Sequence, residues 1–347
     1  MTPAAIITVI SAYFAVILFI SWFTGRKSDN AGFFSGNRKQ SWYVVAIAMI
    51  GSAMSGVTFV SVPGMVATSG FGYMQMALGF IAGQIVIAFV LIPLFYRMNL
   101  VSIYGYLENR FGLSSYRTGA WFFFISKMLG ASVRLYLVCI ALQMMVFGPL
   151  GLPFIVNVAV TVLILIAYTF RGGVKAVIWI DFLKTFCMIV SIALCTIFIS
   201  KSLGFTFGSM CEAVAGSDMS RIFYFDDPDH PQYFFKQFFG GMFTLIAMTG
   251  LDQDMMQRSL TCKNFRDSQK NIITSALLQT VVIFLFLTLG VLLYFFAGAN
   301  GIDATGDTLF PAVATSGLLP AVVGIVFVVG LVSCSYAAGG SALTALT

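Results

Sequence analysis

Apolar residues run through this chain in long stretches that short polar segments interrupt. A helix that crosses a bilayer needs about 20 mostly apolar residues, and nine stretches reach that length. They are residues 4–24, 42–69, 73–98, 118–148, 152–170, 174–200, 233–255, 269–298 and 318–347. The first stretch lacks a basic start and exceeds the apolar core of a cleavable signal peptide. The pattern predicts an all-α, polytopic membrane protein that forms one domain over residues 1–347.

The composition indicates that most of this chain is solvated by lipid. Hydrophobic residues make up 59% and charged residues 9% of the 347 positions, whereas soluble domains carry about 25% charged residues. A soluble enzyme and a nucleic-acid-binding module are thereby excluded, and membrane lipid is an expected partner. The six cysteines show neither CxxC nor CxxxH spacing, and the single histidine, His230, lies between spans. A zinc site, a disulfide framework and a histidine relay within the membrane are therefore not indicated.

The basic residues are divided unevenly between the two sides of the predicted bundle. With the N-terminus outside, thirteen of the nineteen Lys and Arg lie in inner loops, three lie on the outer side, and Lys127, Arg134 and Lys184 lie within spans. Because basic loops stay in the cytoplasm, we expect the N-terminus outside, in a bacterial inner membrane. The last stretch reaches Thr347 without an anchoring charge, so we expect the C-terminal part of the fold to be absent.

The second stretch, residues 42–69, is unlike a regular membrane helix. Gly51, Gly56, Pro63 and Gly64 weaken helix continuity, and four hydroxyl residues, Ser52, Ser55, Thr58 and Ser61, accompany them. Small residues at this spacing also suit tight helix packing. We favour a broken helix, because backbone groups freed within a membrane line a cavity or coordinate an ion.

Ionisable residues within spans are costly, so each is a candidate for function. Asp181 and Lys184 share one helical face, and they form either a neutral pair or a waypoint for a cation. Lys127 either extends to the interface or pairs with a neighbour. Arg134 lies too deep to reach the interface, so a substrate carboxylate or a helix carbonyl is its expected partner. The acidic segment around Asp226 and Asp227 lacks the spacing of a calcium loop and is interpreted as a solvated outer loop.

Five motifs in this order resemble those of the sodium:solute symporter family. They are Phe34-Ser-Gly36-Asn-Arg38, Thr58-Phe-Val-Ser-Val-Pro63-Gly64, Tyr106-Leu-Glu108-Asn-Arg110-Phe111, the segment from Gly172 to Asp181, and Asp252-Gln253-Asp-Met-Met-Gln257-Arg258. The resemblance implies a five-plus-five inverted-repeat transporter fold with an extra N-terminal helix and a truncated second repeat. It also implies a sodium ion as the coupling ion and no other cofactor or metal.

The same resemblance implies positions for ions and solute. A main sodium site would use carbonyls of Gly51 and Met54 with positions Cys334, Ala337 and Ala338, although alanine lacks the hydroxyl that the family offers there. Asp181 and Ser341 keep positions of a second sodium site, at which Gly340 replaces a hydroxyl that some members use. Lys184 stands where Gln is common in the family. The solute-binding positions that match the family are Ser55, Thr58, Tyr73 and, displaced by a few residues, Arg134. Ser52 and Gln75 are further expected solute-binding positions.

The residues and the resemblance together predict a secondary transporter. It would import a small polar organic solute, such as a sugar, a sugar acid or a sialic-acid-like acid, by sodium-coupled symport and alternating access. Hydroxyls beside one buried guanidinium suit a hydroxylated acid, because Arg binds carboxylates in a bidentate manner. A proton-coupled or uncoupled carrier of the same fold, a transporter-like membrane part of a sensor, and an altered chain that carries nothing stay open. No motif for an enzyme or a channel filter is present.

Overall fold

The computed structural model describes residues 3–25, 40–98, 102–148, 150–169 and 173–346. The side chains of some helical residues, including those of 335–346, fall outside this description. Regular structure in the described residues is helical, apart from one isolated bridge between Gln40 and Cys262. The all-α fold class expected from the sequence is confirmed.

The helices fall into long and short groups. The longer ones are α1 (Pro3–Gly25), α3 (Trp42–Ala53), α6 (Tyr73–Val86), α9 (Leu113–Leu142), α10 (Phe154–Thr169), α11 (Gly173–Ser202), α13 (Phe234–Leu245), α15 (Phe265–Asn300) and α17 (Ala321–Leu346). The shorter ones are α4 (Gly56–Gly64), α5 (Val66–Ser69), α7 (Ile92–Arg97), α8 (Gly105–Phe111), α12 (Phe207–Ala215), α14 (Gln253–Ser259) and α16 (Leu309–Thr315). Three π-helical turns, η2 (Ile87–Leu91), η3 (Gln143–Phe147) and η5 (Ile246–Gly250), continue α6, α9 and α13, and two 3-10 turns are η4 (Asp218–Ser220) and η6 (Gly306–Thr308).

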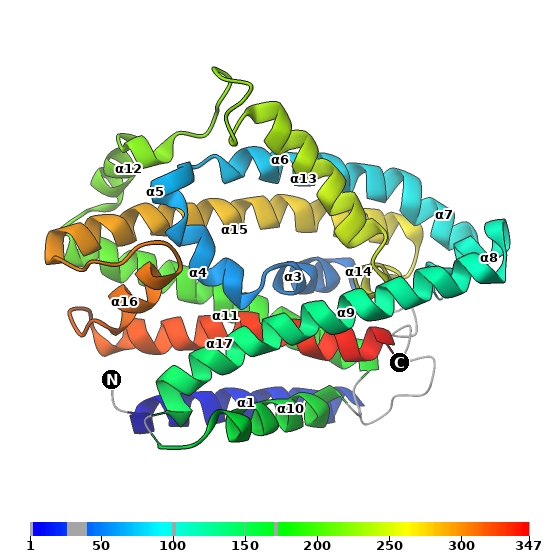
Figure 1. Ribbon diagram of the computed structural model, residues 1–347, viewed down its shortest axis with the longest axis horizontal. Coiled ribbons are helices and arrows are strands. Elements are labelled where there is room, and N and C mark those ends of the chain that lie inside the picture. Colours follow the sequence, from blue (N-terminus) through cyan, green and yellow to red (C-terminus); the bar gives the residue numbers. More distant parts are fainter. Residues whose placement is uncertain (1–2, 26–39, 99–101, 149, 170–172, 347) are drawn as a thin grey trace.

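The long helices stack as roughly parallel rods (Figure 1). Helix α6 packs on α13 along one side of the bundle, and α1 packs on α10 along the opposite side. Helices α3 and α4 lie between α15 and α17, while α9 crosses obliquely over α17 and contacts α4. The broken second segment therefore occupies the middle of the bundle.

Several helices are long and apolar enough to cross a membrane. Within the described residues they are Tyr73–Arg97, Ala176–Ser202 and Phe265–Asn300, together with two bent pairs, Trp42–Ala53 with Gly56–Gly64 and Phe234–Gly250 with Gln253–Ser259. Shorter apolar helices at Ile7–Phe23, Phe154–Ala167 and Ala321–Cys334 lie in three further predicted spans. The total of nine spans stays a prediction.

The second apolar segment is broken between α3 and α4, whose axes differ by 69°. Met54 and Ser55 leave the helical region, with φ/ψ of −95°/126° and −104°/170°. Ser55 then caps α4: its hydroxyl accepts from the Thr58 amide at 3.4 Å, and its own amide donates to Thr58 Oγ1 at 3.3 Å. This capping box satisfies amides at the new helix start.

Helix α4 lies against α15 and η6 so closely that only glycine fits. A Cβ on Gly64 would overlap the backbone of Gly306, and one on Gly290 of α15 would overlap the backbone of Pro63. The Tyr294 hydroxyl adds to this contact, since it donates to the Gly64 carbonyl at 2.6 Å and accepts from the Gly306 amide at 3.2 Å.

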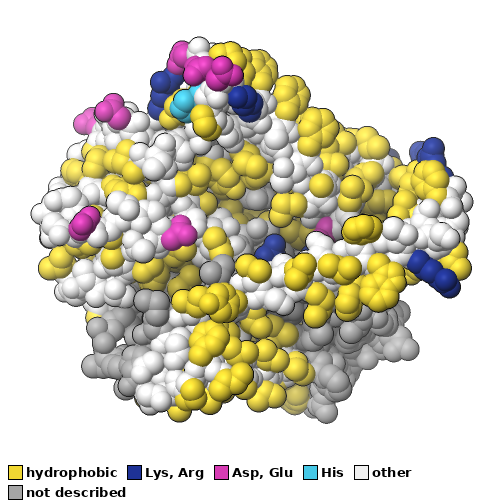
Figure 2. Space-filling model, viewed as in Figure 1, with side chains coloured by type: hydrophobic (Ala, Val, Ile, Leu, Met, Phe, Trp, Pro, Cys, Tyr) yellow, Lys and Arg dark blue, Asp and Glu magenta, His cyan; other side chains and the backbone are white. Residues whose placement is uncertain are grey.

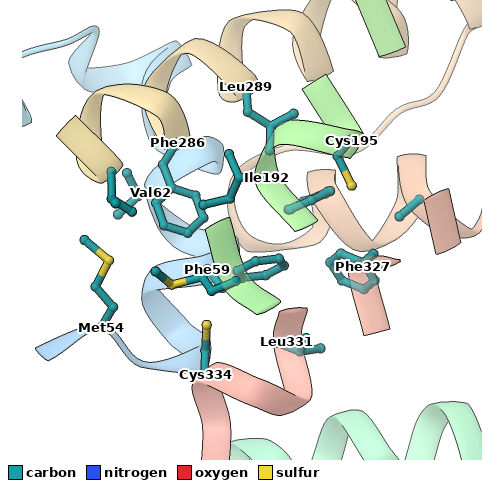
Figure 3. Close-up of a cluster of buried hydrophobic side chains, with 14 of the residues drawn as sticks. Met54, Phe59, Val62, Ile192, Cys195, Phe286, Leu289, Phe327, Leu331 and Cys334 are labelled. Carbon is teal, nitrogen blue, oxygen red and sulfur yellow. The ribbon is translucent and has the colours of Figure 1, made fainter. Parts of the chain in front are cut away.

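A hydrophobic core forms around Phe59 of α4. Its ring stacks on Phe310 at 5.3 Å between centroids and meets Phe286 and Phe327 at 5.6 and 5.9 Å. These side chains come from α4, α15, α16 and α17. Figure 3 shows Phe59, Phe286 and Phe327 together, with Met54 at the break and Cys334 of α17 close to Phe59. Burial of this aromatic cluster fixes the α4 half of the broken segment in the interior.

Candidate functional site

The break in the second segment releases a backbone oxygen. In a continuous helix the Ser55 amide would donate to the Gly51 carbonyl, but here it donates to Thr58 Oγ1. Met54 still closes the last turn by donating to the Ile50 carbonyl at 2.9 Å. The Gly51 carbonyl, one of the two predicted sodium-binding carbonyls, is thus set free of its helical donor at the buried end of α3.

Helix α17 brings the other predicted sodium-binding positions toward this break. It contacts both α3 and α4, and Cys334 is buried, at 4% exposure, in the same cluster as Met54. Ala337, Ala338 and Ser341 continue α17, but their side chains lie outside the described residues. The structure therefore brings together Gly51, Met54 and Cys334.

Three predicted solute-binding positions lie at the break itself. Ser55 and Thr58 form the capping box, and Ser52 lies in the last turn of α3, where its hydroxyl donates to Asp181 Oδ2 at 3.0 Å. Tyr73 begins α6, and its ring packs edge-on against Phe80.

Gln75 and Arg134 have different surroundings. Gln75 is fully buried, donates to the Gln232 carbonyl at 2.8 Å and accepts from the Tyr224 amide at 3.1 Å, so it fastens the segment after α12 to α6. Arg134 is partly buried on α9, the helix that packs on α4 and α17. The solute-binding roles of these residues stay predictions.

A second break, which sequence analysis did not predict, lies between η5 and α14. The two axes differ by 75°, and the Asp252 side chain caps α14 by accepting from the Met255 amide at 3.2 Å. The segment just before α8 contacts this turn: the Ile103 amide donates to Gln253 Oε1 at 2.9 Å, and the Tyr104 hydroxyl donates to the Leu251 carbonyl at 3.2 Å. Burial, and then the nearby Asp252 carboxylate, raise the pKa of Tyr104, so its hydroxyl keeps its proton.

Helix α14 places Arg258 against Asp181 in the interior. Arg258 Nη1 lies 2.5 Å from Asp181 Oδ2 and also donates to the Ser52 hydroxyl. Its Nε and Nη2 both donate to Asp254 at 3.1 Å. The Arg258 and Asp181 side chains are 2% and 1% exposed, so the pair joins α14, α11 and α3 away from water.

Two lysines extend this cluster at opposite ends. Lys184 Nζ lies 3.4 Å from Asp181 Oδ1, and its side chain is 2% exposed. Lys127 of α9 lies 2.8 Å from Asp252 and 3.3 Å from Asp254, at 17% exposure. Of the two interpretations of Lys127, the structure selects pairing with neighbours. Figure 2 shows charged atoms in a hollow above α9, within a largely uncharged and hydrophobic surface.

The segment after α12 behaves as an exposed loop. Arg221 pairs with Asp226 at the surface, where the two side chains are 51% and 78% exposed, and the Tyr224 ring stacks on His230. Within the residues that the structure describes, no group of three or more His, Cys, Asp or Glu could hold a metal ion.

These features define the class of protein as a helical integral membrane protein with two broken helices and a buried charge cluster between them. The model of the sodium:solute symporter family matches residues 33–346. The chain belongs to this family, whose members are transporters.

Named relatives support the same membership. The chain is 26% identical to the human sodium/iodide cotransporter over 284 residues, covering 78% of this chain and 43% of the relative. It is 26% identical to the human sodium-coupled monocarboxylate transporter 2 over 313 residues, covering 86% and 50%. It is 26% identical to the sodium/sialic acid symporter NanT of Aliivibrio fischeri over 300 residues, covering 83% and 57%. The chain thus spans about half the length of these curated relatives.

A solved structure shares the fold. It is the substrate-bound, outward-open state of a Na+-coupled sialic acid symporter, which superposes with a TM-score of 0.86 over 98% of this chain and 72% of that chain, at 19% sequence identity.

Proposed function

We propose that this chain is the membrane core of a sodium-coupled symporter that imports a small polar organic solute by alternating access. The observation that carries the proposal is the break at Met54 and Ser55, which leaves the Gly51 carbonyl without its helical donor. Discontinuous helices near the bilayer midplane are where secondary transporters bind ions and solute. Transport rather than catalysis also agrees with the family to which the chain belongs.

The first sodium ion would bind between the break and α17. Backbone carbonyls of Gly51 and Met54 supply oxygen ligands there, and Cys334 marks the facing turn of α17. Ala337 and Ala338 offer no hydroxyl, so this site depends on backbone oxygens more than on side chains.

The solute would be an organic acid that also carries hydroxyl groups. Ser55 and Thr58 supply hydroxyls at the break, Tyr73 supplies one at the start of α6, and Arg134 supplies a guanidinium on the helix packed against α4. A guanidinium binds a carboxylate through two parallel hydrogen bonds. Two of the relatives are named for organic acids, sialic acid and monocarboxylates, which agrees with this class of solute. A sugar acid fits the same chemistry.

The protein would lie in a bacterial inner membrane with its N-terminus outside. The support is the excess of Lys and Arg in the loops that this orientation places in the cytoplasm.

Uptake by the full-length protein in proteoliposomes tests the proposal. We expect accumulation of a radiolabelled sialic acid, a sugar acid or a short monocarboxylate in a sodium gradient, and loss of accumulation when choline replaces sodium. Arg134→Lys should raise KM more than it lowers kcat, because it keeps the charge but loses the bidentate geometry. Equal uptake in choline contradicts sodium coupling.

A second candidate, a proton-coupled or uncoupled carrier, is favoured by one observation. Asp181, a predicted sodium ligand, already contacts two cationic side chains, Arg258 and Lys184. A pH gradient that drives uptake without sodium would select proton coupling over the first proposal.

A further inference from the structure

Ion pairs join six charged side chains of α9, α11 and α14 into one cluster. Three are acidic and three are basic: Asp181, Asp252, Asp254, Lys127, Lys184 and Arg258. In their usual ionisation states these charges sum to zero. The cluster is graded in exposure, from 1–2% at Asp181 and Lys184 to 17–20% at Lys127 and Asp252.

Asp181 lies at the buried end of this cluster, and partners reach both of its carboxylate oxygens. Oδ2 accepts from Arg258 and from Ser52, and Oδ1 lies 3.4 Å from Lys184 Nζ. Lys184 follows Asp181 by one turn of α11, so the helix itself holds the ammonium beside the carboxylate.

An additional cation at Asp181 would leave this buried cluster with a net positive charge. Charges interact strongly where water is excluded, and an uncompensated buried charge is costly. Removal of the Lys184 charge would reverse the balance and leave the cluster with a net negative charge, since Asp181 would then share its remaining cation, Arg258, with Asp254. The charge on residue 184 therefore decides whether a free cation is favoured at Asp181.

We infer that the Lys184 ammonium is a tethered counter-ion that takes the place of a free sodium ion at Asp181. Lys184 then sets the number of sodium ions that bind, leaving the site at the α3–α4 break as the coupling site. This inference rests on the proposed function, because the second ion is counted relative to the one at the break.

Equilibrium binding of ²²Na⁺ to the purified full-length protein tests the inference. Lys184→Gln removes the charge and supplies an amide oxygen, so we expect it to bind one more sodium ion per protein than the wild type. Sodium should also raise the thermal unfolding midpoint of this variant by about 5 °C more than that of the wild type, as saturating ligand does. Lys201→Gln, which removes an exposed lysine from the last turn of α11, is the matched control and should bind as the wild type does.

The pattern of results separates this inference from the proposed function. A gain of sodium binding in Lys184→Gln that disappears when Asp181→Asn is added supports the tethered counter-ion. This holds even if the wild type binds no sodium. Absence of sodium binding in the wild type would refute only the proposed sodium coupling. Wild-type binding with no gain in Lys184→Gln overturns the inference and leaves sodium coupling intact.

Asp181→Asn alone keeps the inference testable if Lys184→Gln does not fold. Because Asp181 is not a sodium ligand while Lys184 is present, this variant should bind the same number of sodium ions as the wild type. Its Kd for sodium should lie within about twofold of the wild-type value. Loss of a sodium ion in Asp181→Asn overturns the inference.

Discussion

Arg258 links parts of the chain that are distant in sequence. It contacts Asp181, 77 positions away, and Asp254 on its own helix, at 2% exposure. Loss of one partner in a buried pair strands the others without a counter-charge in a medium that solvates them poorly. The stability of the α14 half of the second break therefore depends on this one guanidinium.

We expect Arg258→Met to lower the free energy of unfolding by about 3–5 kcal/mol, the cost of stranding buried carboxylates. The thermal midpoint in detergent measures the loss. Arg221→Met is the matched control, because Arg221 forms an exposed pair with Asp226, and exposed pairs contribute about 0–1 kcal/mol. Equal destabilisation by the two substitutions would show that burial does not determine how much these ion pairs contribute to the free energy of unfolding.

Gly51 provides a second prediction at the residue scale. A Cβ there would overlap Thr185 Oγ1 and lie 2.9 Å from the Asp181 carbonyl oxygen. Gly51→Ala should therefore push α3 away from α11 and cost about 1–3 kcal/mol, as overpacking does. Gly130→Ala on α9, where a Cβ meets nothing within 4 Å, should leave the thermal midpoint unchanged or slightly higher. A neutral Gly51→Ala would mean that α3 and α11 are loosely packed.

Sequence reasoning found some of these residues and missed their partners. Asp181 and Lys184 stand out because ionisable residues within an apolar run are costly. Arg258 did not, because the charge count placed it in an inner loop. Its pairing with Asp181 depends on the way α14 folds back beside α11, and no local pattern specifies that.

At the scale of elements, the two breaks use the same device of a polar side chain that caps a new helix. Ser55 caps α4 and Asp252 caps α14. The first break is visible in the sequence as a concentration of Gly, Pro and hydroxyl residues. The second is hidden in an apolar run without proline, and its only signal is Gly250 followed two residues later by an N-cap residue, Asp252.

The cap of α4 can be tested against a second capping box in the same chain. Ser55→Ala should cost about 0.5–2 kcal/mol, because the Thr58 amide loses its acceptor. It should also weaken sodium-dependent uptake, because the Thr58 turn that holds the Ser55 amide away from the Gly51 carbonyl is loosened. Thr206→Ala removes the corresponding cap from α12, so it should show a similar local cost with uptake unchanged. Thermal unfolding and proteoliposome uptake measure the two effects. Wild-type uptake by the Ser55→Ala protein would show that sodium binding does not depend on the cap of α4.

At the scale of the whole molecule, the apolar pattern predicted the all-helical class and the five motifs indicated the family, and both are confirmed. It did not predict that α6 packs on α13 or that α3 lies between α15 and α17. Such contacts join segments that are far apart along the chain. Helices in lipid choose their neighbours by close packing of small residues rather than by hydrophobic periodicity.

Cysteine labelling tests the orientation of the bundle. Cys211 of α12 is exposed, whereas Cys262 is fully buried and its burial raises the pKa of the thiol to about 12. Only the thiolate reacts readily with maleimides. A membrane-impermeant maleimide should therefore label intact cells at Cys211 and leave Cys262 unmodified until the protein is denatured. Cys211→Ser should abolish that labelling, and labelling of Cys211 only after permeabilisation would reverse the orientation.

The glycine contacts of α4 restrict how the bundle can change shape. Gly64 against Gly306 and Gly290 against Pro63 leave no gap in which α4 could slide along α15, and Tyr294 bonds to both sides of the contact. We expect helix α4, α15 and the turn at 306 to move together. The two extended residues Met54 and Ser55 join that block to α3, so any change of angle between α3 and α4 would be taken up by these two residues.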